Sequence, residues 1–345
     1  MRFTHQCVEH VQKLPPFTKP LITSLWKEPF HRRSNEQDES IYSFVRRRLG
    51  PEFADIAIDA LCRGIFAGDC RKLSVQACFP PLYEMEKKYG SLIAGAVFGF
   101  KDPKVEATGL VRRAIEDKWA SWSLSRGLQQ LTDAMAASIQ NTKEGEIRLD
   151  TKVSTPSDSI EASLVISAVY SKDLAAALPK SMTDLKEDLS ALPSVNVVVG
   201  FGHLLPSFES GPILGVVYDS CTYPEHNRKV KGCPESTRIT VMLGGSWYKL
   251  LSPDGTLPSG SDIAWMASQA AAQQLGIKSH PIRSHVTLQK ECLPQYKVGH
   301  VSWVEKVEQK IKESNLPLHL VGSSYSGPAI NDYNAKKVVE SLKAH

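Results

Sequence analysis

The chain has 345 residues, of which 42% are hydrophobic and 23% are charged, and its formal net charge is +4. This length allows two or three domains with a substantial core, and the composition is that of an ordered globular protein. The positive residues form no long run, which argues against nucleic-acid binding, but a slight positive bias suits a carboxylated substrate or an anionic membrane surface.

The first hundred residues are predicted to be mainly helical. Apolar residues at helical spacing predict one helix over 41–49 and a second that starts at Pro51 and ends at Gly64. The arginines at 46–48 are interpreted as a solvated helix face, with contact to phospholipid headgroups as the alternative. The apolar run 92–100 is about half as long as a membrane span, so it predicts either a core helix or one that lies in a single leaflet.

The middle of the chain alternates between helix and strand patterns. An amphipathic helix is predicted after Gly127, and a strand over 146–153. The continuous apolar run 163–169 is typical of a strand covered on both faces. Further strands are expected over 197–199, 212–218, 238–243, 285–288 and 318–321, and helices over 261–275 and 331–343.

Phe201 stands between two glycines where one strand breaks. The glycines let the backbone reverse and turn the ring away from its strand, where a flat apolar ligand could stack on it. The alternative is a buried hairpin loop whose phenylalanine fills the core. The neighbouring His203 is interpreted as a structural histidine, with a role as a base as the alternative.

Two other features could bind a ligand. The glycine loop 322–327 follows a strand and precedes a helix, a geometry that points N–H groups at a phosphate or an electron-rich cofactor, although it is neither a GxGxxG nor a P-loop motif. Arg63 could hold a carboxylate through paired hydrogen bonds, or it could simply be a cation near a helix C-terminus. The seven scattered cysteines contain no CxxC pair, so we expect no zinc site and no disulfide framework.

Several short segments of the chain form a recognisable set: GFGHL (200–204), LGVVYDS (214–220) and VMLGGSW (241–247), with PFTKPL, RRLG, DALCRGIFAGDCRKL, CFP, WASWSLSRGL and GSSYSGPAIND elsewhere. Together these segments resemble the protoporphyrinogen oxidase family of flavoenzymes. They occur in the family's order over nearly the whole sequence. The resemblance is therefore specific to this family rather than to flavin enzymes in general.

The resemblance implies an α/β and α+β fold in three parts. These are an incomplete FAD/NAD(P)-binding, Rossmann-like domain, a mixed-sheet substrate domain and a helical membrane-binding domain. The implied boundaries are 1–110 for the membrane-binding region, 111–170 and 303–345 for the FAD-binding domain, and 171–302 for the substrate domain.

The implied activity is the oxidation of protoporphyrinogen IX to protoporphyrin IX, with FAD as the cofactor and dioxygen as the oxidant. No side chain is predicted to be catalytic and none to bind a metal, because the cofactor carries this chemistry. The residues implied to contact the substrate are Leu61, Arg63, Phe201, Gly202, Leu204 and Leu293. Those implied to contact FAD are Val153, Pro328, Ala329 and Ile330. The implied setting is one leaflet of the mitochondrial inner membrane, with a homodimer possible and no nucleic-acid partner.

The sequence departs from the family at the dinucleotide-binding fingerprint. The GxGxxG motif that seats the FAD pyrophosphate is absent, so we expect an incomplete gene product or splice form that binds FAD poorly. A non-catalytic porphyrin- or partner-binding remnant of the family is the alternative function. A different flavin oxidase is less expected, because it would not share GFGHL or LCRGIFAG.

Overall fold

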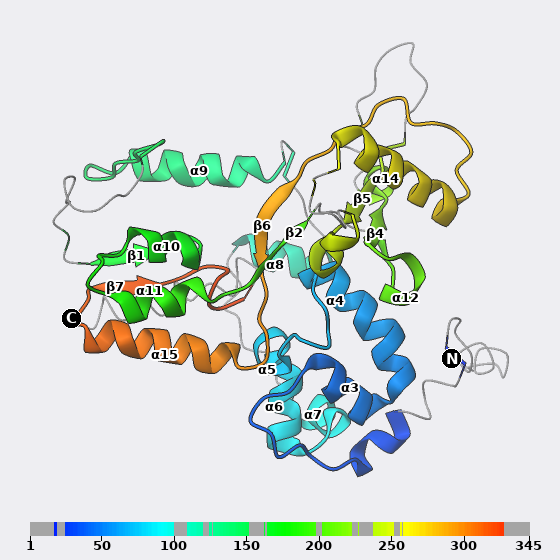
Figure 1. Cartoon of the computed structure of the whole chain (residues 1–345), viewed down its shortest axis with the longest axis horizontal. Helices are drawn as coiled ribbons and strands as arrows, with labels where there is room; N and C mark the ends of the chain where they lie inside the picture. The colour runs from blue at the N-terminus through cyan, green and yellow to red at the C-terminus, as the bar shows by residue number, and fades with distance from the viewer. Residues whose placement is uncertain are drawn as a thin grey trace. The chain divides into compact units, whose positions relative to one another are not determined.

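The computed structural model describes residues 17–18, 25–99, 109–119, 124–125, 127–151, 162, 164–197, 202–222, 227, 237–251, 256 and 258–327. Within these residues the chain is a mixture of helices and small sheets, as the sequence predicts (Figure 1). It forms two compact units, one of Met1–Gly99 with Ile160–His345 and the other of Phe100–Ser159. The three-part domain division expected from the sequence stays a prediction.

The larger unit contains most of the regular structure. Its helices are η1 (Glu28–Phe30), α3 (Ile41–Leu49), η2 (Phe53–Ile58), α4 (Asp59–Phe66), α5 (Val75–Cys78), α6 (Pro80–Tyr89), α7 (Leu92–Gly99), α10 (Ser171–Ala177), α11 (Thr183–Ser190), α12 (Ser207–Ser210), α13 (Asp219–Thr222), η4 (Gly245–Leu250), α14 (Gly260–Leu275) and α15 (His300–Glu313). Its strands are β1 (Val165–Ser167), β2 (Ser194–Val197), β3 (Gly202–Leu204), β4 (Ile213–Val217), β5 (Thr240–Leu243), β6 (Gln289–Pro294) and β7 (Leu318–Leu320). The smaller unit contains α8 (Gly109–Glu116) and α9 (Gln129–Gln140), which confirms the helix expected after Gly127.

Three sheets organise the described part of the larger unit. Strands β1 and β7 pair in parallel, β2 and β6 pair antiparallel, and β3, β4 and β5 form an antiparallel sheet in that order. The parallel pair lies beside α10, α11 and α15, whose apolar faces form one core with Leu189, Val307 and Leu320 at its centre (Figure 1). A second core fills the helical region around Phe44 and Cys62.

The helix expected to end at Gly64 continues past it. Six residues of π-helix, η2, lead into α4, which ends at Phe66, where Ala67 takes a left-handed conformation with a φ of 48°. A Cβ at position 64 would lie 2.4 Å from a methyl carbon of Leu204. Gly64 therefore serves close packing between α4 and β3 rather than helix termination.

Three strand predictions also need correction. The stretch 146–151 is irregular in the described part of the chain, and Glu146 instead pairs with Arg148 at 2.8 Å. The strand expected at 285–288 begins later, at Gln289, because β6 is fixed by its pairing with β2. Strand β1 is not covered on both faces, since Val165 and Ile166 are 45% and 49% exposed. The strands expected at 212–218, 238–243 and 318–321 are confirmed as β4, β5 and β7.

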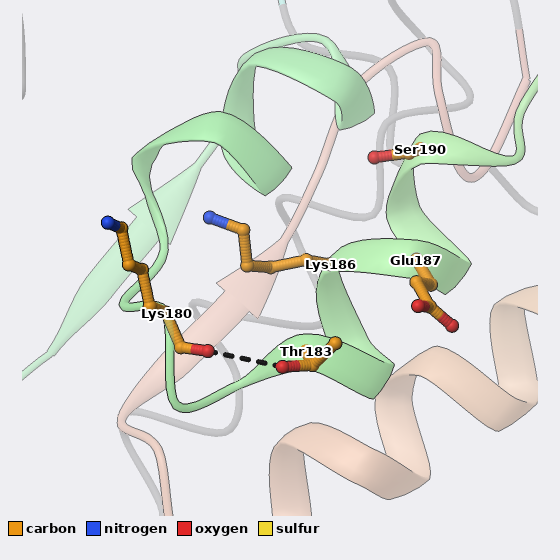
Figure 2. Close-up of a pocket in the computed structure, with 5 residues that line it drawn as sticks. All are labelled: Lys180, Thr183, Lys186, Glu187 and Ser190. Carbon is orange, nitrogen blue, oxygen red and sulfur yellow. Dashed lines mark hydrogen bonds between the residues drawn. The ribbon is translucent and has the colours of Figure 1, made fainter.

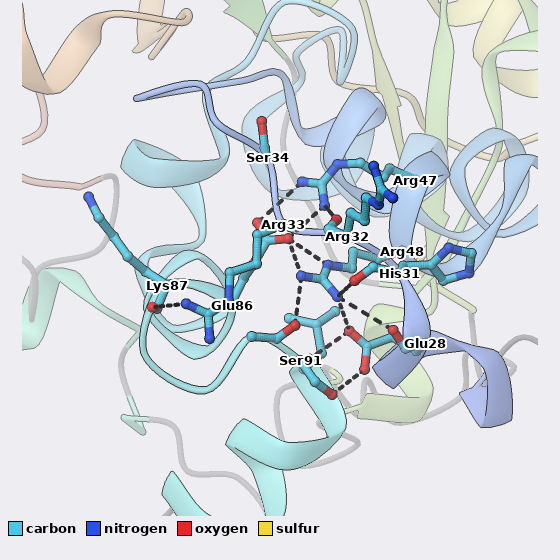
Figure 3. A network of polar contacts seen from close by, with 12 residues as sticks. Glu28, His31, Arg32, Arg33, Ser34, Arg47, Arg48, Glu86, Lys87 and Ser91 are labelled. Carbon is cyan, nitrogen blue, oxygen red and sulfur yellow. Dashed lines mark hydrogen bonds and ion pairs between the residues drawn. The ribbon is translucent and has the colours of Figure 1, made fainter.

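The arginines at 46–48 do not form a solvated face. Only Arg46 is exposed; Arg48 is completely buried, and its guanidinium bonds to the carboxylates of Glu28 and Glu86 and to the carbonyl oxygen of Gly90 at 2.9 Å (Figure 3). Arg47 pairs with the carboxylate of Glu86 at 2.6 Å. Burial of these charges is tolerated because each guanidinium meets carboxylates and carbonyls within one network.

The same network fixes the start of α7. The carboxylate of Glu28 accepts hydrogen bonds from the backbone N–H groups of Leu92 at 2.8 Å and Ile93 at 3.2 Å, and so it caps this helix from outside (Figure 3). Beyond the cap the helix emerges from the core, with Val97 68% and Phe98 72% exposed. Across the described residues, no helix is both long and apolar enough to span a bilayer.

Candidate active site

Helix α4 joins the helical region to the β3–β4–β5 sheet. One of its faces packs Cys62 and Phe66 into the helical core. Another face carries Arg63 and Gly64 toward strands β3 and β4, which contact this helix. Any site built where the two regions meet therefore takes its helical wall from α4.

Arg63 is completely buried at this junction. Its Nη2 group donates to the carbonyl oxygens of Gly211, at 2.8 Å, and of Ile213, and the guanidinium carbon lies 3.9 Å from the ring centroid of Trp247. Its Nε and Nη1 groups are buried without a hydrogen-bond partner among the described residues. Burial lowers the pKa of Arg63 to about 10, against the opposing charge of Asp59, so the side chain is a cation at neutral pH with unused donors.

Two of the predicted substrate residues meet in an apolar cluster next to Arg63. Leu204 of β3 and Leu293 of β6 pack against a buried centre of Ala67, Leu214 and Met242, and Trp247 belongs to the same cluster. The structure thus brings Arg63, Leu204 and Leu293 together from three distant parts of the sequence. Aliphatic and aromatic walls beside a cation suit a flat macrocycle with acid side chains.

Of the other predicted substrate residues, Leu61 lies in α4 and Gly202 in β3, and Phe201 lies outside the described part. Leu61 is 36% exposed on α4. Gly202 pairs with Val217 at the start of β3, and a Cβ there would meet the carbonyl oxygen of Val216 at 1.7 Å. Phe201, on which the stacking hypothesis rests, lies outside the described residues, so its role stays a prediction.

Two residues at the junction received no role from the sequence. Trp247 stacks on Arg63, and Asp59, 1% exposed on α4, accepts hydrogen bonds from the backbone N–H of Ser207 at 2.5 Å and from the thiol of Cys70 at 3.5 Å. Both residues lie inside segments that resemble the family, and this resemblance is the signal that could have identified them. Their contacts involve residues far away in sequence, so spacing alone could not assign them.

His203 has a structural partner. Its Nδ1 atom hydrogen-bonds to the hydroxyl of Tyr218, and the two rings lie 5.7 Å apart across the β3–β4 hairpin. This contact favours the structural interpretation of the histidine.

The glycine loop 322–327 lies at the carboxyl end of the parallel strands. Its end glycines, Gly322 and Gly327, have φ angles of 100° and 135°, which favour glycine. A Cβ on Gly322 would approach the carbonyl oxygen of Ala168, just past β1, to 3.4 Å. The loop therefore lies at the edge of a parallel sheet, which is where such sheets bind cofactors. All four predicted FAD contacts, Val153, Pro328, Ala329 and Ile330, lie outside the described residues.

Two hollows lie in the described part of the chain, and the second adjoins the apolar cluster through Val195. One, of about 320 Å³, is lined by Lys180, Thr183, Lys186, Glu187 and Ser190 along α11 (Figure 2). In it the Thr183 hydroxyl donates to the Lys180 carbonyl oxygen at 3.2 Å, and the Lys186 amine donates to the Leu178 carbonyl oxygen at 2.9 Å. The other, of about 200 Å³, is polar and lies between the segment after α4 and strand β2, with Asp69, Ser194 and Gln295 in its wall. Neither hollow is lined by a predicted substrate residue.

Comparison with known families defines the class of protein. Residues 8–258 match the family described as flavin-containing amine oxidoreductases. A crystal structure from Exiguobacterium sp. 255-15, provisionally named a protoporphyrinogen oxidase, has the same fold, with a TM-score of 0.68 at 19% identity over 96% of this chain and 73% of that one. The expected oxidoreductase class and the flavin cofactor, FAD, are thereby confirmed.

Relatives define the family more narrowly. The chain is 39% identical to human protoporphyrinogen oxidase, a match that covers 92% of this chain and 71% of the human protein. It is 27% identical to coproporphyrinogen III oxidase of Bacillus subtilis, over 86% of this chain and 65% of that protein. The chain belongs to the protoporphyrinogen oxidase family, as its sequence segments predict.

Proposed function

We propose that this chain oxidises protoporphyrinogen IX to protoporphyrin IX in haem biosynthesis, with FAD as its cofactor and dioxygen as the final oxidant. The observation that carries the proposal is the 39% identity to human protoporphyrinogen oxidase over 92% of the chain. A coproporphyrinogen III oxidase is 27% identical, so the proposed substrate is the protoporphyrinogen for which the more similar relatives are named.

The described residues fit a flavin. The carboxyl edge of the β1–β7 pair and the loop 322–327 together offer backbone groups with no side chain at either end of the loop. In the proposal this loop and the residues at 328–330 hold the flavin ring, and Val153 holds the adenine end. When bound, the flavin supplies a hydride acceptor that dioxygen can reoxidise.

The chain's own residues bind and orient the substrate. Leu204 and Leu293 supply an apolar wall for the macrocycle and exclude water from it. In the proposal the buried Nε and Nη1 donors of Arg63 pair with a propionate carboxylate, which would relieve the cost of burying them unpaired. Leu61, Phe201 and Gly202 complete the proposed pocket.

The proposal includes attachment to one leaflet of the mitochondrial inner membrane. It is supported by exposed apolar side chains just before η1, in η1 and in α7, where Trp26 is 79%, Phe30 83%, Val97 68% and Phe98 72% exposed. Apolar and aromatic side chains on short helices favour the interfacial zone of a bilayer. A homodimer is part of the proposal on the basis of the resemblance alone.

A turnover assay tests the proposed function. The full chain, supplied with FAD in air, should convert protoporphyrinogen IX to fluorescent protoporphyrin IX faster than it oxidises coproporphyrinogen III. Samples without the chain give the rate of spontaneous oxidation. If neither porphyrinogen is oxidised faster than in those samples, the proposed activity is wrong, and a preference for coproporphyrinogen III would change the substrate.

A further inference from the structure

One tyrosine hydroxyl ties both ends of the glycine loop 322–327. The hydroxyl of Tyr296, which follows β6, donates to the carbonyl oxygen of Ser323 and accepts from the backbone N–H of Gly327 at 3.1 Å. A phenol can donate and accept at the same time, so a single atom spans the loop. We infer that Tyr296 is a positioning residue, which holds this loop in the shape that accepts the flavin.

Tyr296 is itself held in place from two sides. Its ring, 2% exposed, stacks on the imidazole of His300 with centroids 4.1 Å apart, and its carbonyl oxygen accepts from the backbone N–H of Ser74 at 2.8 Å. The hydroxyl therefore projects from a fixed backbone and a fixed ring. The tether connects the loop to the helical region through Ser74.

His300 supports the middle of the same loop. Its Nε2 atom lies 3.3 Å from the carbonyl oxygen of Tyr325, so this nitrogen carries the hydrogen in the neutral ring. The ring of Tyr325 in turn lies parallel to that of Trp303, with centroids 6.1 Å apart. Tyr296 and His300 thus fix the two ends and the centre of the loop from outside it.

The loop needs such a tether because its own sequence does not restrict it. Glycines sample more backbone conformations than other residues, and here they stand at both ends of the loop. A binding loop that is free to move loses affinity through the entropy of ordering it, whereas a loop held in the bound shape does not. The two hydrogen bonds of Tyr296 order the loop before a ligand binds, and so reduce this entropic cost.

The inference rests on the proposed flavin-binding function, and its test separates the two. The variant Tyr296→Phe keeps the ring and removes both bonds. The matched control is Tyr83→Phe in the helical region, whose buried hydroxyl likewise donates to one carbonyl oxygen, that of Gln37, and accepts from one donor, the side-chain ammonium of Lys87. Both variants lose one donated and one accepted hydrogen bond, so a general loss of stability should affect both alike.

Hydrogen exchange of the flavin-free full chain is measured first. We expect the amide of Gly327 to exchange roughly tenfold faster in Tyr296→Phe than in the wild type, and to be unchanged in Tyr83→Phe. Equal exchange in Tyr296→Phe and the wild type would overturn the inference, whatever the chain binds.

Titration with FAD, followed by flavin fluorescence, is the second measurement. Tyr296→Phe should bind FAD roughly tenfold more weakly than the wild type and Tyr83→Phe. At saturation its bound flavin should also differ in fluorescence from that of the wild type, a change that lost stability alone would not produce. Equal affinity and equal spectra would overturn the inference. A wild type that binds no FAD would refute the proposed function and the flavin part of this inference. The exchange result would then decide whether Tyr296 tethers the loop.

Discussion

Two buried arginines are balanced in different ways. Arg48 lies among carboxylates and carbonyl oxygens, so its charge is paired. Arg63 bonds only to carbonyl oxygens and a tryptophan ring, and it retains two unsatisfied donors among the described residues. Because an unpaired buried donor is costly, Arg63 is the arginine whose environment a bound carboxylate would complete.

A lysine at position 63 tests the carboxylate role. Arg63→Lys keeps the charge but loses the planar fork, so we expect the KM for protoporphyrinogen IX to rise about tenfold with a smaller effect on kcat. The KM for the dimethyl ester of the substrate, which has no carboxylate, should rise much less. If the acid and the ester are affected equally, Arg63 acts only through packing.

The imidazole of His300 should make stability depend on pH. Burial lowers the pKa of His300 from 6.5 to about 4, so the unfolded chain takes up the proton first as the pH falls. The stability contribution is complete above pH 6.5 and is lost as the pH falls toward 4, by up to about 3 kcal/mol.

Urea unfolding at a series of pH values measures this effect. His300→Gln cannot titrate, so its free energy of unfolding should decline less steeply than that of the wild type over this interval. Identical pH profiles for the two proteins would show that the histidine is protonated equally in the folded and unfolded states.

At the scale of elements, the network around Glu28 determines how α7 leaves the core. The carboxylate pairs with the buried Arg48 and caps α7 at Leu92 and Ile93. An uncharged amide could not fully replace either the ion pair or the cap. We expect Glu28→Gln to lower the free energy of unfolding by about 3 kcal/mol. The loss should not be larger, because Arg48 keeps Glu86 as its other partner.

The matched control for this change is Glu84→Gln on the exposed face of α6. An exposed substitution should alter the free energy of unfolding by less than about 0.5 kcal/mol. Comparable values for the two variants, measured by urea unfolding, would mean that the buried network contributes little to stability.

Periodicity predicted most of the elements but not their contacts. The apolar spacing of α3 and α9 and the alternation in β5 were sufficient to locate them. The prediction placed β6 too early in the sequence, because the first three residues of this strand are polar and exposed. Its position is set by pairing with β2. Gly64 was read as a helix end because the sequence does not show that Leu204 packs against it.

For the candidate site, too, residues were predicted but contacts were not. Resemblance supplied Arg63, Leu204 and Leu293, and the fold brings them together. The burial of Arg48 was missed because its partners Glu28 and Glu86 lie 20 and 38 residues away. Long-range pairing of this kind leaves no local signal in a single sequence.

At the scale of the whole molecule, the proposed membrane attachment predicts binding to vesicles. Val97→Ser with Phe98→Ser removes two exposed apolar side chains from the end of α7 and should weaken flotation with phosphatidylcholine vesicles that contain cardiolipin by about tenfold. Ile282→Ser, at a residue 87% exposed in another region, is the control. Equal flotation of both variants would exclude α7 as the membrane contact.

The most direct test of the account is anaerobic mixing of the full chain, reconstituted with FAD, with protoporphyrinogen IX. The account predicts that the chain retains FAD, that the visible absorbance band of the flavin bleaches, and that protoporphyrin fluorescence appears after air is admitted. A chain that quenches porphyrin fluorescence but retains no flavin, or a flavin that stays oxidised beside the porphyrinogen, would contradict it.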